Sequence, residues 1–126
     1  MVDTHVLWWY FWHPDRLSVA AQAVFRLAET KNAIIIVPAI VVAEIYFLSV
    51  KLGQPFSPSD LFEALDGVTG IRDSDLGRSQ LVRLDVLTDV GEMHDRLIAA
   101  EAMIRAAPIL TRDPSLTKSS HVTTVW

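Results

Sequence analysis

The sequence contains no cysteine, only five glycines, and slightly more acidic than basic residues. Without cysteine, a disulfide framework and a thiolate metal site are both excluded, which fits a reducing compartment such as the cytoplasm. The motifs GxxxxGK[ST], GxGxxG, GxSxG and HExxH are also absent, so the sequence carries no signature of a nucleotide-binding loop, a serine hydrolase or a zinc protease. The formal net charge of −4 provides no global positive field that could attract nucleic acid.

Length and composition predict one domain spanning residues 1–126. Apolar residues make up 51% of the chain and charged residues 21%, so it can bury a core and is not a disordered segment. The long apolar stretch 33–50 is interrupted by Pro38 and carries Glu44 near its centre. A charged Glu44 inside a bilayer would cost several kcal/mol of free energy. No Lys or Arg precedes the first apolar run, unlike in a signal peptide. We therefore expect a soluble, cytoplasmic protein without a membrane segment.

The pattern of apolar residues, prolines and glycines predicts helices that alternate with strands. Such an alternation is typical of a parallel sheet covered by helices on both faces. A first strand is expected to end at Asp3, and the run Ile34–Val37 has the β-branched composition of a central strand. The further predicted strands are 68–71, 109–111 and 121–125, and the predicted helices are 15–30, 39–52, 58–67, 75–87 and 95–107.

Glu44 has the sequence neighbourhood least suited to a charge. On the predicted helix Ile40, Val41, Phe47 and Leu48 flank it, and no basic residue lies within one turn. A buried carboxylate costs several kcal/mol unless it is paired or bound to a cation. The sequence therefore favours a functional site for Glu44, and the alternative is that Glu44 lies on an exposed edge of the helix.

Three aspartates lie where a predicted strand ends or a predicted helix begins. Asp3 follows the first strand, Asp113 follows strand 109–111, and Asp95 opens the helix 95–107. Aspartate is also a good helix N-cap, so capping is the alternative role for each, and for Asp95 taken alone it is the favoured one. Ligands of parallel α/β proteins bind outside the carboxyl ends of the strands, where these residues and Glu44 can meet. Four carboxylates without a histidine or thiolate partner suit a hard cation, Mg²⁺ or Mn²⁺.

The segment 7–12 (LWWYFW) is apolar on every side if it is helical. A domain of this size can hardly bury all these rings, so we expect some of them to contact another chain. Packing of the rings into the protein's own core is the equal alternative.

Four stretches of the chain resemble the PIN-domain family and, within it, the VapC-type toxins of bacterial and archaeal toxin–antitoxin pairs. Each stretch alone is a weak signal, but their order and spacing match over the whole chain. Residues 122–126 also resemble the family's closing strand. The four stretches are 3–9 (DTHVLWW), 43–45 (AEI), 94–100 (HDRLIAA) and 109–113 (ILTRD).

The resemblance implies a three-layer α/β/α fold around a central parallel sheet, and metal-dependent hydrolysis of RNA phosphodiester bonds. Thr111 matches a hydroxyl position that often supports the site, and Thr4 follows the first acid as in relatives. The implied partners are an RNA substrate, a small antitoxin protein and a second copy of the chain in a homodimer. The catalytic residues and ligands of Mg²⁺ or Mn²⁺ that the resemblance implies are Asp3, Glu44, Asp95 and Asp113.

The sequence departs from the family pattern without losing any of the four acids. Only two residues precede Asp3, so the first strand is shorter than usual. Residues 91–94 (GEMH) replace the family's common lead-in to the third acid. Glu101 stands where an uncharged residue is typical, and an ion pair with Arg105 one turn later is its favoured interpretation.

Two alternatives to an RNA-cutting toxin remain open. The first is a noncatalytic PIN-like module that binds RNA or protein, against which the four intact acids argue. The second is a PIN nuclease that acts on DNA. His5 is assigned equally to the site or to packing, while Arg96 and Arg112 adjoin the site acids and could contact RNA phosphate. For surface arginines in general, a solvated or ion-paired state is the default.

Overall fold

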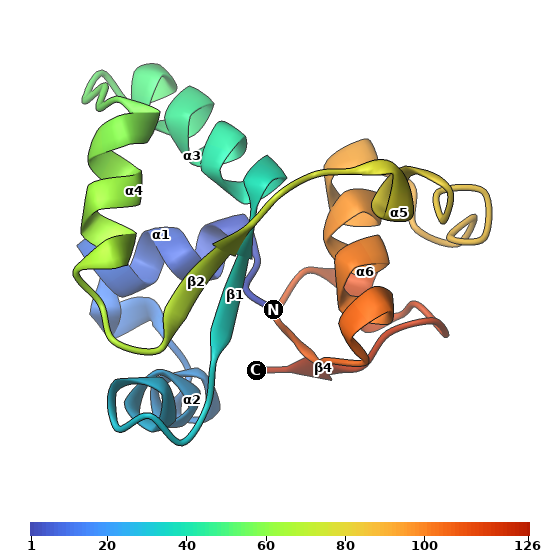
Figure 1. Cartoon of the computed structure of the whole chain (residues 1–126), viewed down its shortest axis with the longest axis horizontal. Coiled ribbons are helices and arrows are strands. Elements are labelled where there is room, and N and C mark those ends of the chain that lie inside the picture. Colours follow the sequence, from blue (N-terminus) through green and yellow to red (C-terminus); the bar gives the residue numbers. More distant parts are fainter.

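The computed structural model describes residues 1–126 and consists of helices that alternate with short strands (Figure 1). The strands are β1 (Ile35–Pro38), β2 (Ile71–Ser74), β3 (Ile109–Leu110) and β4 (Thr124–Val125). The helices are α1 (Thr4–Trp12), the 3₁₀ helix η1 (Pro14–Arg16), α2 (Val19–Glu29), α3 (Ala39–Lys51), α4 (Pro58–Asp66), α5 (Arg78–Leu81), α6 (Met93–Arg105) and α7 (Pro114–Thr117).

The strands form two parallel pairs, and the N-terminal residues join them. β1 pairs with β2, and β3 pairs with β4. Between the two pairs, the Val2 N–H donates to the Ile36 carbonyl oxygen at 3.1 Å, and Val2 forms a parallel bridge with Leu110. The order across the sheet is therefore β2, β1, the Val2 segment, β3 and β4. The expected first strand is present only as this bridge.

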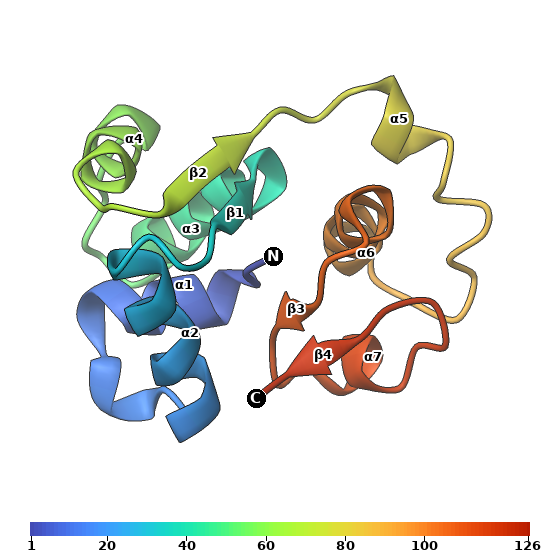
Figure 2. The ribbon, with the colours of Figure 1, turned by 60° about the horizontal axis from the view of Figure 1, so that its bottom comes forward.

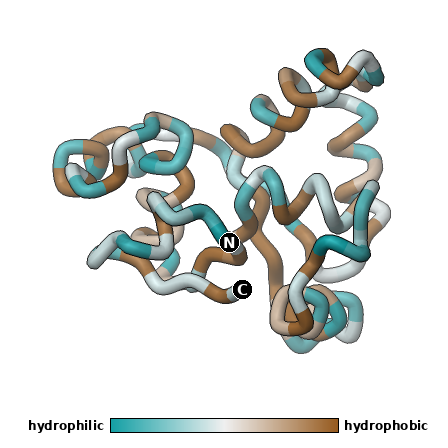
Figure 3. The backbone as a smooth tube through the Cα atoms, turned by 180° about the vertical axis from the view of Figure 1, so that it is seen from behind, coloured by the Kyte–Doolittle hydropathy of each residue, from teal (hydrophilic) through white to brown (hydrophobic).

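The arrangement divides the chain into two halves around the Val2 segment. α1 to α4 gather around β1 and β2, while α5 to α7 gather around β3 and β4, and the N-terminus lies between them (Figure 2). The buried apolar side chains nevertheless form one continuous cluster that draws on both halves, including Val2, Val37, Ile45, Ile98 and Ile109. Hydrophobic segments accordingly meet near the middle of the molecule in Figure 3. No helix combines the length and the apolar character that crossing a membrane requires.

β2 begins at the last residue of the strand predicted at 68–71. Gly70 has a φ of +78°, and a Cβ at this position would lie 2.2 Å from the carbonyl oxygen of Ala28. The position therefore requires glycine, and its left-handed backbone cannot continue an extended strand. Pairing starts one residue later, with Ile71 opposite Ile35.

The prediction of a long helix over 75–87 is wrong, because only α5 is helical there. The Gln80 side chain folds this segment into a turn: its Oε1 accepts from the Gly77 N–H at 3.0 Å, and its Nε2 donates to the Asp75 carbonyl oxygen at 3.1 Å. The helix predicted over 15–30 is also shorter, since α2 starts at Val19 after a cap by Ser18. On α2 the core takes Phe25, while Leu27 is exposed.

Most of the aromatic segment 7–12 packs within its own chain. Trp8 and Trp9 are buried, whereas Trp12 is 39% exposed. The Trp12 ring stacks on Trp8 at 4.3 Å and on Phe56 at 5.0 Å between ring centroids. The rings therefore belong largely to the core, which was one of the two expectations, and Trp12 keeps an exposed edge.

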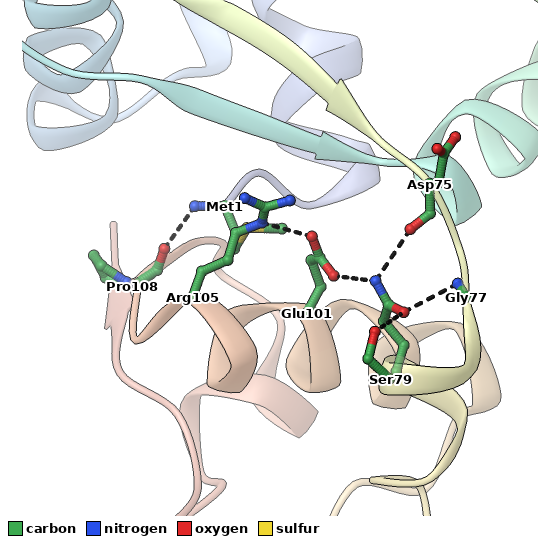
Figure 4. Close-up of polar contacts among 8 residues, drawn as sticks. Met1, Asp75, Gly77, Ser79, Glu101, Arg105 and Pro108 are labelled. Atoms are coloured by element: carbon green, nitrogen blue, oxygen red, sulfur yellow. Dashed lines mark hydrogen bonds and ion pairs between the residues drawn. The ribbon is translucent and has the colours of Figure 1, made fainter.

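Glu101 is a buried carboxylate that links α6 to α5 (Figure 4). Its Oε1 accepts from Arg105 Nε at 2.6 Å, which confirms the predicted pair, and its Oε2 accepts from the Gln80 side-chain amide. At the other end of this region, the Met1 amino group donates to the Pro108 carbonyl oxygen at 2.8 Å. Burial acts to raise the pKa of Glu101, but the bonds from Arg105 and Gln80 outweigh it and hold the pKa below its usual value.

Replacing Arg105 with alanine should lower the free energy of unfolding by about 1–2 kcal/mol at pH 7, because Glu101 stays buried with fewer donors. Since the folded pKa of Glu101 is depressed, the stabilisation is present above its unfolded pKa and is lost as the pH falls through the folded value. Urea unfolding at pH 7 and at pH 3 measures this. Equal losses at both pH values would contradict a charge-dependent role, and Arg26→Ala, on the exposed face of α2, is the matched control.

Candidate active site

The four predicted acids come from both halves of the fold. Asp3 directly precedes α1 and Glu44 lies in the second turn of α3, whereas Asp95 lies in the first turn of α6 and Asp113 precedes α7. Asp3 follows the Val2 segment and Asp113 follows β3, so both lie at the carboxyl ends of parallel chain segments. Ligands of parallel α/β sheets bind outside these carboxyl ends.

Asp3 is buried, with 5% of its surface exposed. It occupies the N-cap position of α1, but its side chain makes no capping bond. Instead its Oδ2 accepts from the Thr111 hydroxyl at 2.7 Å. Burial raises the pKa of Asp3, the Thr111 bond opposes this, and the nearby charge of Asp113 adds to the rise. Asp3 is therefore a buried acid next to another acid and not a helix cap.

Thr111 connects Asp3 with Asp113. Its buried hydroxyl donates to Asp3 and accepts from the Asp113 N–H at 2.9 Å. Asp113 in turn caps α7, because its Oδ1 accepts from the Ser115 N–H at 2.7 Å. The capping alternative thus holds for Asp113, and its Oδ2 accepts no hydrogen bond within the chain.

Asp95 is half-buried and does not cap its helix. α6 begins two residues earlier than predicted, with Glu92 at the N-cap position, so Asp95 is the third helical residue. Its pKa is raised to about 6, first by burial and then by the negative charges of Asp113 and Asp3, with a smaller contribution from Glu44. Asp95 is therefore near enough to the other three acids to feel their charge.

Glu44 is more exposed than the sequence suggests. About a quarter of its side chain (27%) is accessible, since Phe47 and Ala43 on the same helix edge face solvent. The expectation of a buried Glu44 is therefore only partly right, and the exposed-edge alternative describes its surroundings better. Its Oε2 accepts from the Thr4 hydroxyl at 2.5 Å, and its Oε1 lies 3.4 Å from His94 Nδ1.

His94 is the neighbour of the site that sequence reasoning missed. The only signal was its place next to Asp95, in a segment that departs from the family pattern. Arg96 takes neither of the roles considered for it, which were a contact with RNA phosphate and the default solvated or ion-paired state. Its side chain donates to the carbonyl oxygens of Val90 and Leu84 and fastens the loop before α6.

A small pocket opens beside Asp3 and Asp113. It has a volume of about 190 Å³ and is also lined by His5, Trp9, Arg112 and Pro114. The Arg112 guanidinium carbon lies 4.5 Å from the centre of a Trp9 ring, which is a cation–π contact. His5, which also lines the pocket, is exposed.

The acids have little compensating positive charge. No Lys or Arg forms an ion pair with any of the four. His94 lies against Glu44, while His5 and Arg112 line the pocket beside Asp3 and Asp113. As they stand, no three acidic or histidine side chains are close enough to form a ready-made set of metal ligands. The arrangement is therefore a cluster of repelling acids and not a closed coordination cage.

The sequence matches no family model and no curated protein. Among solved structures, a chain from the crystal structure of VapBC2 from Rickettsia felis, bound to a DNA fragment of the VapBC2 promoter, superposes on this chain with a TM-score of 0.75. The match covers 99% of this chain and 96% of that chain, at 17% identity. The fold is PIN-like. The predicted three-layer α/β/α architecture with a parallel sheet is confirmed, and at this identity the likeness concerns the fold alone.

Proposed function

We propose that this chain is a metal-dependent endoribonuclease and the toxin of a type II toxin–antitoxin pair. The observation that carries the proposal is the mutual influence of the acids. The pKa of Asp95 is raised to about 6, first by burial and then by Asp113, Asp3 and Glu44, and no Lys or Arg forms an ion pair with any of the four acids. A fold that keeps such a cluster against its own repulsion is suited to bind a cation. The fold shared with a VapBC2 chain supports the same conclusion.

The donor atoms fit Mg²⁺ or Mn²⁺, because carboxylate oxygens are the ligands these ions prefer. Asp3, Glu44 and Asp95 are the proposed direct ligands, with Asp113 binding directly or through water. Asp3 and Glu44 are already oriented by the hydroxyls of Thr111 and Thr4. Because no three ligands are in place beforehand, ion binding has to draw the carboxylates of the two halves closer together.

The chain's own residues position the reacting groups. A divalent ion supplies activation of water and neutralises the charge that builds on the phosphate during hydrolysis. Asp3 and Asp113 are held at a fixed separation through Thr111, and Thr4 fixes one oxygen of Glu44. These hydrogen bonds limit the reorganisation that is needed when RNA binds.

We further propose that the partners are a small antitoxin and a second copy of this chain. Both would cover apolar side chains that the folded chain leaves exposed. Phe47 is 70% exposed beside Glu44 on α3, and Val50 and Trp12 also remain accessible. A contact over Phe47 would lie next to the site, so an antitoxin bound there would restrict access to it.

The proposal is tested by incubating the purified protein with single-stranded RNA in Mg²⁺, in Mn²⁺ and in EDTA. We expect cleavage with either metal and none with EDTA. Asp3→Asn, purified in parallel, should be inactive, and equal cleavage by this variant would reveal a contaminating nuclease. Single-stranded DNA of the same sequence is the matched substrate; faster cleavage of DNA would favour the DNA nuclease, and binding without cleavage would favour the noncatalytic module.

A further inference from the structure

The pocket beside Asp3 and Asp113 has features that the metal site does not use. Its volume of about 190 Å³ lies below the range of about 300–1,000 Å³ that is typical for drug-sized ligands. One ring system, and not a whole nucleotide, is therefore the size of group that it accepts. It opens directly next to Asp3 and Asp113, two of the proposed metal ligands. A nucleotide that adjoins the cleaved phosphate would lie at this position.

Arg112 lines this pocket, is exposed to solvent and has no acidic partner within ion-pair distance. Its guanidinium lies over the Trp9 ring and takes part in no ion pair or hydrogen bond within the chain. Trp9 is itself 5% exposed and packs against Trp126 at 5.6 Å, so it forms a rigid floor. The planar fork of Arg112 is thus oriented while its N–H groups remain available.

The position of the pocket indicates a base and not a second phosphate. Asp3 and Asp113, which line it, are also proposed ligands of the ion that would neutralise the cleaved phosphate, so the pocket beside them is left for an adjoining base. A flat ring also suits the aromatic wall that Trp9 provides. Guanine complements both walls, because its O6 and N7 accept the two bonds of an arginine fork and its amino edge donates toward carboxylates.

We propose that this pocket binds one unpaired guanine of the RNA, next to the phosphate that is cleaved, with Arg112 as the residue that recognises the base. The inference rests on the proposed ribonuclease function and adds to it a preferred nucleotide. His5, an exposed residue that lines the pocket, supplies a ring on which the base can stack. Unpaired RNA is the substrate class that exposes a base in this way.

The test is RNA binding in the Asp95→Asn background, in which cleavage does not obscure the equilibrium. Fluorescence anisotropy compares a short oligouridylate with a single central guanosine, the same RNA without guanosine, and one with 7-deazaguanosine, which lacks the N7 acceptor. We expect the guanosine RNA to bind about 10-fold more tightly than the other two. Arg112→Lys keeps the charge but loses the fork, so it should remove this preference and leave the salt dependence unchanged. Arg26→Lys, exposed on α2, is the control.

The outcomes separate this inference from the proposed function. If RNA is bound and cleaved but Arg112→Lys retains the guanosine preference, the pocket assignment is wrong and the nuclease stands. If Arg112→Ala weakens all three RNAs equally, Arg112 contacts phosphate, which also overturns the assignment. If no RNA is bound and the wild-type protein cuts none, both proposals fail together. Thermal melts show whether each variant is folded before its binding is interpreted.

Discussion

Asp95→Asn should strongly reduce RNA cleavage and at the same time make the metal-free protein more stable. Loss of one metal ligand removes several kcal/mol of transition-state stabilisation, so we expect activity to fall about 100-fold or more. The gain in stability arises because the ionised Asp95 is disfavoured in the folded state, first by burial and then by repulsion from Asp113, Asp3 and Glu44. Since Asp95 is only half-buried, solvent screening limits this gain to about 1 kcal/mol. Single-turnover cleavage and melting in EDTA measure the two effects.

The stability that Asp95→Asn gains over the wild-type protein should increase as the pH rises. The folded pKa of Asp95, about 6, lies above its unfolded value, so the unfolded chain loses this proton first as the pH rises. The wild-type protein therefore loses stability between about pH 4 and pH 6, and the penalty persists at higher pH. Asparagine carries no charge, so the advantage of the variant should be complete at pH 7–8 and disappear near pH 4.

Asp85→Asn is the matched control, because Asp85 is exposed in the loop before α6 and accepts no side-chain hydrogen bond. It should change neither cleavage nor the pH dependence. If Asp95→Asn melted at a lower temperature than the wild type in EDTA, Asp95 would be a structural residue of α6 and the repulsion account would be wrong.

Thr111→Val should disturb both Asp3 and Asp113 while changing side-chain volume little. The variant leaves Asp3 buried without its hydroxyl donor and leaves the Asp113 N–H without its acceptor. We expect a loss of about 2–3 kcal/mol in unfolding free energy and about a 10–100-fold loss in Mn²⁺ affinity. Urea unfolding and calorimetric titration provide the two values.

The pH dependence of the cleavage rate shows whether Thr111 acts through the Asp3 carboxylate. The Thr111 hydrogen bond lowers the pKa of Asp3, so its loss should raise that pKa. The acidic limb of the profile, where the rate falls as Asp3 is protonated, should then move to higher pH. Thr111→Ser keeps the hydroxyl and should restore the limb, even though it removes a methyl group from a buried position. An unchanged limb in Thr111→Val, combined with lower stability, would mean that Thr111 has only a packing role.

The alternation of strands and helices could be predicted because most signals are local. The run before Pro38 forms β1, and Ser57 with Asp60 forms the capping box that begins α4. β2 could not be placed correctly, since Gly70 is fixed by its approach to Ala28, a contact between residues far apart in the sequence. The segment 75–87 looks helical by composition, but Gln80 bonds to Gly77 and Asp75 and limits the helix to one turn.

In the site, too, local features could be predicted from the sequence, whereas contacts between distant segments could not. The positions of Asp3 and Asp113 after extended segments were predictable, and so was the possibility that Asp113 caps a helix. The exposure of Glu44 depends on how α3 meets α6, which no local pattern reveals, and His94 was missed for the same reason. The Arg112–Trp9 contact joins the two halves of the chain and likewise required the fold.

The central claim is that carboxylates from both halves of the chain hold one divalent ion. The most direct test is calorimetric titration of Mn²⁺ into the wild-type protein, into Asp3→Asn from the first half and into Asp95→Asn from the second. We predict that the wild type binds Mn²⁺ and that each variant loses at least about 10-fold in affinity. Equal affinity in all three proteins, or no binding by the wild type, would contradict it.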